Sequence, residues 1–401
     1  MNFIAISPQF PKSYWNFCDR LMKNGVNVLG IGDTPYDELS KELKNSLTEY
    51  YLVEDMLNRE SMLKAVAYFT FKYGKIDWLE SNNEFWLESD AYLRTNFNIT
   101  SGYKDDNIGN FKLKSSMKNF YKKAGIKSAR CSKVSDLKTA QAFIKTVGFP
   151  VIVKPDNGVG ASATYKIRNE AELKEFYKYK PKNAYLMEEF ISGTIYSYDA
   201  ITNSKKKILF ETVHCFPDPI MDVVNTGNHL NYYTVKNIDK DLLELGRKTI
   251  KAFGVKSRFV HFEFFRLLED RPGLAKKGEL VALEVNMRPA GGYSPDMMNF
   301  ANMCDVYQIY ADMICFDENK QPKIDRKYYC AYASKKDGKQ YIHSNEQIKS
   351  RYFSNIVMDE RMPDILSDAM GNYMFNACFY TLDQVQEFIH YVQAEVEEKI
   401  I

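Results

Sequence analysis

The sequence has no apolar run of the roughly 20 residues that a membrane-spanning helix needs, and its 401 residues carry a net charge of only +2. The 54 basic residues nearly balance the 52 acidic ones and are spread along the chain. Because nucleic-acid binding needs clustered basic side chains, we expect no nucleic-acid partner and no membrane partner. The longest basic run, residues 205–207, is interpreted as a turn between two strands.

Cysteine pairs and two common nucleotide motifs are also missing. The seven cysteines are scattered singly, without a Cys-x-x-Cys spacing, which argues against a disulfide framework or a zinc site and favours a cytoplasmic location. No Gly-Lys-Ser or Gly-Lys-Thr of a Walker A loop follows Lys154. Gly30 and Gly32 lack the third glycine and the helix of a dinucleotide fingerprint, so we reject a dehydrogenase.

One segment, VALEVNMR at residues 281–288, alternates apolar and polar side chains. In a strand, successive side chains point to opposite faces, so Glu284, Asn286 and Arg288 share a face while the apolar residues fill a core. A carboxylate, an amide and a guanidinium on one face predict a site. A structural ion pair between Glu284 and Arg288 is the alternative explanation.

A second alternating segment, HFEFF at residues 261–265, places Glu263 opposite its aromatic neighbours. The glycine-containing loop that follows predicts that the two segments pair as antiparallel strands, so that Glu263 faces Glu284. Two carboxylates that close need a cation. Carboxylate and amide oxygens suit a hard cation such as magnesium.

A third motif offers an anion site. Residues 151–154 predict a buried strand that ends in Lys154, and a loop of small residues follows at 156–162. Small residues allow backbone N–H groups to close on an anion, and lysine adds a point charge for phosphate. Taken alone, this loop is better explained by an ordinary hairpin turn, and the paired glutamate strands reverse that preference. Its small residues are Gly158, Gly160, Ala161 and Ser162.

In their order and spacing these motifs resemble the ATP-grasp superfamily of carboxylate-amine ligases, including amino-acid ligases and the large chain of carbamoyl-phosphate synthetase, over about residues 1–315. The resemblance implies ATP and two Mg²⁺ or Mn²⁺ ions. It further implies the following roles: Lys114, Lys154 and the small-residue loop contact the phosphates, Glu263, Glu284 and Asn286 hold the ions, and Arg288 steadies the transferred group. Lys112 and Lys118 are alternatives to Lys114. Lys118 lies one helical turn from Lys114. The alternative for one of these two lysines is that it is simply exposed to solvent.

The resemblance also implies an adenine site at residues 185–191, where Glu188, Glu189 and Ile191 would contact the base. The carboxylate that holds the ribose in similar proteins would fall near Ile195, which departs from the pattern. Asp199 is a candidate replacement, although a surface role explains it equally well.

The fold class that we expect is α/β, an ATP-grasp fold with an N-terminal doubly wound parallel sheet. Strands are expected near residues 2–6, 26–31, 50–53 and 76–79, and Thr381 is expected to begin a helix with a capping box. The domains that we expect are an N-terminal domain at 1–110, a small nucleotide-covering lobe at 111–190, a large lobe with the metal and substrate site at 191–316, and a packing or dimerisation segment at 317–401.

The expected function is an ATP-dependent ligase that phosphorylates a carboxylate and couples it to an amine. Gly291 and Gly292 are expected to let the substrate approach backbone amides, and His229 is a candidate substrate contact whose alternative is a structural imidazole. A carbamoyl-phosphate-synthetase-like phosphotransfer enzyme and a nucleotide-binding module without turnover remain open. Small-molecule acid and amine substrates and a homodimer complete the expectation.

Overall fold

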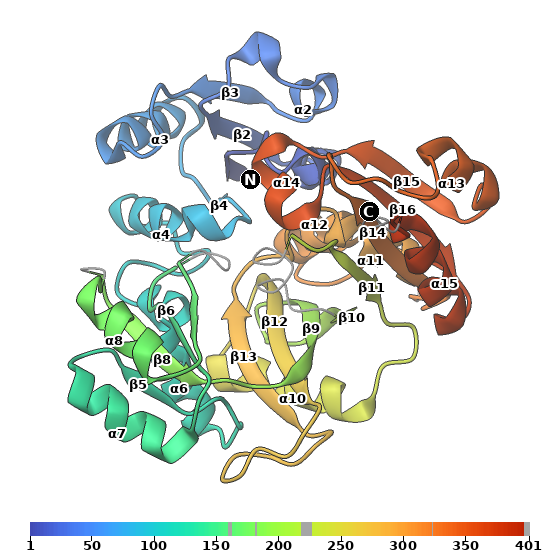
Figure 1. Cartoon of the computed structure of the whole chain (residues 1–401). Helices are drawn as coiled ribbons and strands as arrows, with labels where there is room; N and C mark the ends of the chain where they lie inside the picture. The colour runs from blue at the N-terminus through green and yellow to red at the C-terminus, as the bar shows by residue number, and fades with distance from the viewer. Residues whose placement is uncertain (159–162, 181–182, 218–226, 323, 397–401) are drawn as a thin grey trace.

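A computed structural model describes the chain except for residues 159–162, 181–182, 218–226, 323 and 397–401 (Figure 1). The described residues form three sheets: a parallel N-terminal sheet, a small antiparallel sheet, and a long antiparallel sheet of eight strands. None of the described helices is both long enough and apolar enough to cross a bilayer.

The N-terminal sheet confirms the predicted doubly wound arrangement. Its strands are parallel and have the order β3-β2-β1-β4. Alternate residues of β1 enter two cores: Phe3 packs with α1 and α12, whereas Ile4 packs with α3. The elements are β1 (Asn2–Ile6), α1 (Trp15–Lys23), β2 (Asn27–Gly32), α2 (Lys41–Asn45), β3 (Glu49–Leu52), α3 (Arg59–Tyr73), β4 (Trp78–Glu80), the 3-10 turn η3 (Glu84–Trp86) and α4 (Leu87–Asn96).

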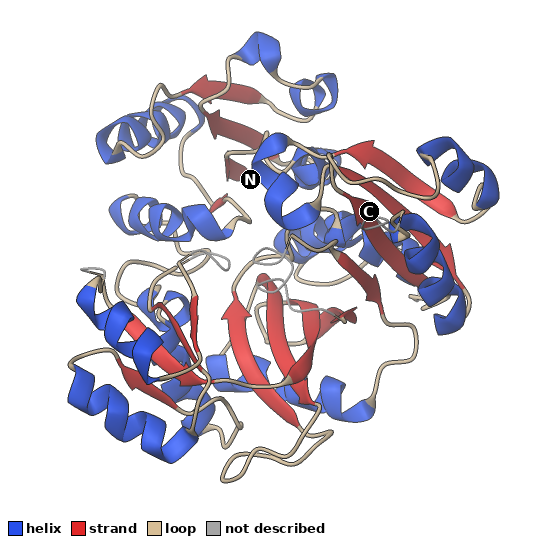
Figure 2. Cartoon of the chain, viewed as in Figure 1, coloured by secondary structure: helices blue, strands red, loops and turns tan. Residues whose placement is uncertain are grey.

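The small sheet follows in the chain and has the order β5-β8-β6-β7, with every pair antiparallel. Helices α7 and α8 cover one face of it, as Figure 2 shows, because their apolar residues Ile144 and Leu173 pack on Val151 and Val153. The elements are α5 (Gly109–Lys112), α6 (Lys114–Lys123), β5 (Cys131–Lys133), α7 (Leu137–Val147), β6 (Val151–Pro155), β7 (Tyr165–Ile167), α8 (Glu170–Lys178) and β8 (Tyr185–Glu189).

The long sheet has the order β13-β12-β9-β10-β11-β14-β16-β15. Strands that are far apart in the sequence are neighbours in this sheet. For example, β12 pairs with β9 along its whole length. The elements are β9 (Gly193–Thr202), β10 (Ile208–Phe216), β11 (Asn231–Thr234), α10 (Lys240–Phe253), β12 (Arg258–Leu267), β13 (Leu280–Asn286), α11 (Ser294–Asn302), α12 (Val306–Phe316), β14 (Tyr329–Lys335), α13 (Asn345–Arg351), β15 (Ile356–Arg361), α14 (Asp364–Met370), β16 (Tyr373–Phe379) and α15 (Leu382–Gln393).

The two faces of the long sheet carry different partners. Tyr198 of β9 packs in the core beneath α10, whereas Ile201 of the same strand packs against α12. At the other end of the sheet, α15 packs on β14 and β16 through Phe388. Alternation along each strand therefore decides whether a polar side chain faces the α10 and α15 side or the α11 and α12 side.

Strands from both 191–316 and 317–401 belong to this one sheet, so the C-terminal segment extends the sheet that holds the expected metal strands. The domain boundaries stay a prediction. The expected capping box is confirmed: the Thr381 side chain accepts from the Gln384 amide, and Gln384 reaches back to the N-cap backbone.

Candidate functional site

Two glutamates face each other across a strand pair, as the sequence predicted. In the antiparallel pair of β12 and β13, Glu263 lies directly opposite Glu284, and Asn286 lies opposite His261. A bulge follows Glu263, so that Phe264 faces Ala282. Like charges directly opposite on neighbouring strands are destabilising, so each carboxylate needs a compensating partner.

Lys114 compensates Glu284 and ties the site to the loop after β6. Its Nζ atom lies 3.1 Å from Glu284 Oε1 and donates to the Gly158 carbonyl at 3.0 Å. The start of α6 is fixed by Asp156, which accepts from the Ser115 amide at 2.8 Å and from the Ser115 hydroxyl at 2.7 Å. The expected phosphate contacts Gly160, Ala161 and Ser162 lie outside the described residues.

Glu188 lies between two lysines in the interior. Its Oε1 atom is 2.8 Å from Lys118 Nζ, and its Oε2 atom is 2.8 Å from Lys154 Nζ. All three side chains are at most 10% exposed. Burial alone would raise the pKa of Glu188, but the two ammonium groups outweigh it and hold that pKa at about 2. Opposing effects act on Lys154, whose pKa is raised because Glu188 and Glu284 outweigh its desolvation.

The structure separates the three lysines that the sequence left in competition. Lys112 pairs with Glu84 of η3 at 3.1 Å, Lys114 with Glu284, and Lys118 with Glu188. The idea that Lys114 or Lys118 is solvated was wrong, because both are buried. Lys114 and Lys118 are four residues apart on α6 and therefore share a helical face. That spacing was the feature of the sequence that could have placed Lys118 in the site.

Arg288 lies two residues after the end of β13, close to Glu84 of η3. Its Nε atom is 3.4 Å from Glu84 Oε2, and its Nη1 atom donates to the Pro289 carbonyl at 2.7 Å. The structural ion pair with Glu284, which was the alternative explanation for these residues, is not among the ion pairs of the described residues. In the turn that follows, Gly292 has a φ of +58°, and a Cβ there would lie 2.5 Å from Met370 Cε, whereas Gly291 has open space.

Asp199 is fully buried and anchors a chain of polar side chains. It accepts from His261 Nδ1 at 2.7 Å, His214 Nδ1 at 3.0 Å and the Ser197 hydroxyl at 2.6 Å. The other ring nitrogen of His261, Nε2, lies 3.1 Å from Glu263 Oε1. A ribose contact by Asp199 would require an exchange of these partners, and that role stays a prediction. Alternation along residues 261–265 puts His261 on the same face as Glu263, but the sequence prediction gave His261 no role.

The end of β8 is held by two arginines. The Glu189 carboxylate accepts from the Arg130 amide at 2.7 Å, from Arg130 Nη2 at 2.6 Å and from Arg271 Nε at 3.1 Å. Ile191 is buried with Leu267 and Val281. These contacts fix the segment where the adenine is expected, and the adenine roles of Glu188, Glu189 and Ile191 stay predictions.

His229 lies against the C-terminal segment. Its Nε2 atom is 2.6 Å from the Tyr341 hydroxyl, and its Nδ1 atom is 3.5 Å from Glu395. Burial and the nearby Lys339 lower the pKa of His229 to about 4, so the ring is neutral at pH 7. Its expected contact with substrate stays a prediction.

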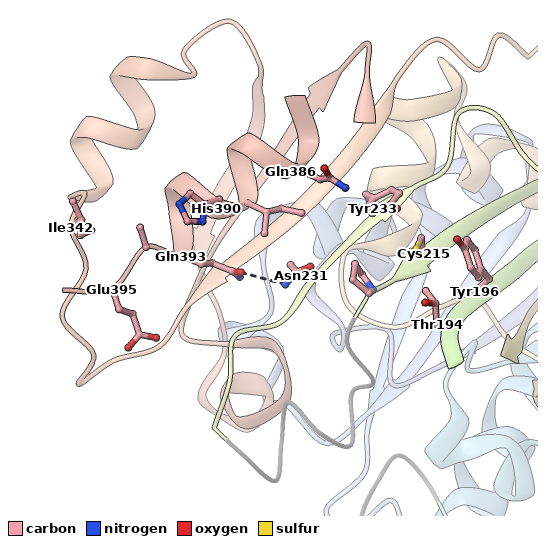
Figure 3. Close-up of a pocket in the computed structure, with 13 residues that line it drawn as sticks. Thr194, Tyr196, Cys215, Asn231, Tyr233, Ile342, Gln386, His390, Gln393 and Glu395 are labelled. Carbon is pink, nitrogen blue, oxygen red and sulfur yellow. Dashed lines mark hydrogen bonds between the residues drawn. The ribbon is translucent and has the colours of Figure 1, made fainter. Parts of the chain in front are cut away.

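A cavity of about 940 Å³ lies beside strands β9, β10 and β11 of the long sheet (Figure 3). Tyr196, Cys215 and Tyr233 line its sheet side, and Gln393 reaches Asn231 across it. In the register of the sheet, Cys215 faces Tyr196 and Tyr233, whereas Glu263 faces Ser197 on the alternate side. The sheet therefore separates this cavity from the glutamate pair.

The glutamate pair suits a cation that also needs ligands from a bound molecule. Within the described residues, no three His, Cys, Asp or Glu side chains are placed to bind a metal by themselves. Glu263, Glu284 and the amide of Asn286 share one face and offer hard oxygen ligands. Magnesium sites commonly use one or two carboxylates together with phosphate oxygens, so this set suits a metal that arrives with a nucleotide.

Comparison with known proteins identifies a domain family and relatives of this chain. The sequence model of one protein family, described as an ATP-grasp domain, matches residues 118–292. An L-arginine-specific L-amino acid ligase from Bacillus subtilis is 25% identical over 290 residues, which are 68% of this chain and 65% of that ligase. The carbamoyl phosphate synthase large chain of Clostridium beijerinckii is 24% identical over 330 residues, which are 71% of this chain and 29% of that protein. This chain thus spans less than two thirds of the length of both relatives.

Among solved structures, an L-amino acid ligase from Bacillus licheniformis superposes with a TM-score of 0.72, covering 98% of this chain and 96% of that one. The two sequences are 13% identical. At this level of identity, the likeness bears on the fold alone.

Proposed function

Because this chain contains an ATP-grasp domain and has the ATP-grasp fold, we propose that it is an ATP-dependent ligase that joins a carboxylate to an amine. The observation that carries the proposal is the pair Glu263 and Glu284, which lie opposite each other in register with a buried lysine 3.1 Å from one of them. The similarity to an L-amino acid ligase supports amino-acid-like substrates.

In this proposal Glu263, Glu284 and Asn286 would hold two Mg²⁺ or Mn²⁺ ions. Such ions would supply the positive charge that offsets the charge developing during phosphoryl transfer. We assign Lys114 and Lys154 to the phosphates, since Lys114 lies 3.1 Å from the expected metal ligand Glu284 and Lys154 shares the buried cluster through Glu188. We assign Arg288, two residues after Asn286, to steady the transferred group.

The reaction proceeds in two steps. A carboxylate oxygen of the first substrate attacks the γ-phosphorus, which releases ADP and leaves an acyl phosphate. The amine nitrogen of the second substrate then attacks the acyl carbon, phosphate departs, and the nitrogen loses a proton to give an amide. Water must be kept from the acyl phosphate, and we assign this task to the small lobe that contains β5 to β8.

A phosphotransfer enzyme of the carbamoyl-phosphate-synthetase type is the second candidate, and the 24% identity to such a large chain over 71% of this sequence favours it. It would use the same ATP residues and differ in the acceptor. Identification of the product separates the two, because a ligase yields an amide whereas the alternative yields a phosphorylated small molecule.

The test is ADP release measured against panels of carboxylates and amines. We expect release that requires both an acid and an amine, together with an amide product seen by mass spectrometry. Glu284→Gln is expected to abolish release while the fold is retained. Glu279→Gln is the matched control, because Glu279 directly precedes β13 and pairs with Lys127, where both side chains are 46% exposed.

Two results count against the proposal. Purified protein that releases no ADP with any acid and amine pair would contradict ligase activity, and full activity of Glu284→Gln would contradict the metal assignment. Size measurement of the same sample also tests the homodimer, which is part of the proposal.

A further inference from the structure

We propose that His261 is a positioning residue that holds Glu263 in its metal-binding orientation, and that Asp199 fixes the His261 ring from the other side. This inference rests on the proposed function, because it assumes that Glu263 receives a divalent ion. It concerns a part of the site that is buried behind the glutamate pair.

Strand register brings the three residues together. His261 and Glu263 lie two residues apart on β12, so their side chains point to the same face. On the adjacent strand β9, Asp199 lies directly opposite His261. The contacts follow that register: Asp199 Oδ1 is 2.7 Å from His261 Nδ1, and His261 Nε2 is 3.1 Å from Glu263 Oε1.

The chemistry of the two neighbours decides what the ring does. Ionised carboxylates only accept hydrogen bonds, so His261 donates from both nitrogens and cannot rotate without losing a partner. The two bonds, on opposite sides of the ring, fix its plane and direct Nε2 at one oxygen of Glu263. The other oxygen of Glu263 makes no hydrogen bond or ion pair with the described residues and is left for the cation.

Each of the two glutamates has one carboxylate oxygen held by a neighbouring side chain. His261 holds Oε1 of Glu263, and Lys114 holds Oε1 of Glu284 at 3.1 Å. Each carboxylate therefore has one oxygen fixed by a cationic or donating partner. Groups that orient metal ligands in this way typically change metal affinity by about 10- to 100-fold when removed.

His214 provides a matched control inside the same cluster. It is fully buried and lies 3.0 Å from Asp199 through its Nδ1 atom, as His261 does on the other side. Among the described residues, the side chain of His214 makes polar contacts with Asp199 and Ser197 and none with Glu263. A change at His214 therefore disturbs the buried cluster without touching the metal ligand directly.

The experiment measures Mn²⁺ binding to the full chain in the presence of saturating ADP, with free Mn²⁺ followed by electron paramagnetic resonance. The variants are His261→Phe, His261→Gln and His214→Phe. Thermal unfolding is measured for each in EDTA, without nucleotide, so that loss of fold is recorded separately from loss of metal affinity.

We expect His261→Phe to weaken Mn²⁺ binding at least tenfold and His261→Gln, which keeps a donor, to weaken it less. His214→Phe should bind Mn²⁺ within about twofold of the wild type even where its unfolding midpoint falls. Equal weakening by His261→Phe and His214→Phe, or no weakening by either, would overturn the inference. A wild-type protein that binds no Mn²⁺ with ADP would overturn the metal assignment of the proposed function as well.

Discussion

Replacing Glu188 with glutamine is expected to destabilise the fold severely, because it leaves two buried ammonium groups without their carboxylate. Lys118 and Lys154 each lie 2.8 Å from a different oxygen of Glu188, and none of the three side chains is more than 10% exposed. Glutamine matches the size of glutamate but carries no charge. The change therefore tests the electrostatic contribution of the carboxylate with little change in packing.

Two estimates give a similar magnitude. Removal of one partner from a buried ion pair costs about 3–5 kcal/mol. Independently, the folded chain lowers the pKa of Glu188 from 4.5 to about 2, and at about 1.4 kcal/mol for each tenfold change in proton affinity this corresponds to about 3 kcal/mol. We expect Glu188→Gln to lower the free energy of unfolding at pH 7 by this amount.

The same shift predicts the pH dependence. Because the folded pKa is lower than the unfolded one, the stabilisation is complete above pH 4.5 and is lost as the pH falls toward 2. The difference between the wild type and Glu188→Gln should therefore shrink by about 2 kcal/mol between pH 7 and pH 3.

Urea unfolding at pH 7, 4 and 3, followed by circular dichroism, measures both effects. Glu279→Gln is the control, because its exposed pair with Lys127 should contribute little at any of these pH values. A loss at pH 7 below about 1 kcal/mol, or a difference that does not change with pH, would refute the idea that Glu188 compensates two buried charges.

Two further predictions concern packing and capping. Gly246→Ala should lower the free energy of unfolding by about 1–3 kcal/mol despite the higher helix propensity of alanine, because a Cβ at Gly246 would lie 2.3 Å from the Tyr198 ring; an unchanged or raised thermal midpoint would contradict this contact. Thr381→Ala should cost about 1 kcal/mol in urea unfolding because it removes the side-chain acceptor of the α15 capping box, and Thr381→Ser should restore most of the loss; equal stability of all three proteins would contradict it.

Local patterns in the sequence were sufficient for part of the site. Alternation along residues 281–288 placed Glu284, Asn286 and Arg288 on one face, and the intervening turn was enough to predict that Glu263 faces Glu284. Both inferences concern residues on one strand or on two strands joined by a single turn. Over such short separations, the alternation of side chains and the residues of the turn strongly constrain the structure. The four strands of the N-terminal sheet were predictable for the same reason.

Contacts between distant segments were not predictable in this way. Lys118 and Glu188 are 70 positions apart, and their contact depends on how α6 packs against the small sheet, which no local period records. Glu84 reaches Arg288 from the N-terminal domain across a still longer separation. In each case the sequence identified a charged residue but left open its partner, and therefore whether it was buried.

The buried chain from Glu263 to Asp199 shows why this matters for function. Alternation shows that His261 and Glu263 share a face, but only the insertion of β12 beside β9 puts Asp199 within 2.7 Å of His261. A buried carboxylate without a partner would be costly, so Asp199 and the two histidines depend on one another for their burial. The same long-range pairing that completes the sheet therefore also sets the orientation of the expected metal ligand. A sequence change that shifted the β9 and β12 register by one residue would turn these side chains to the other face and separate Glu263 from its support.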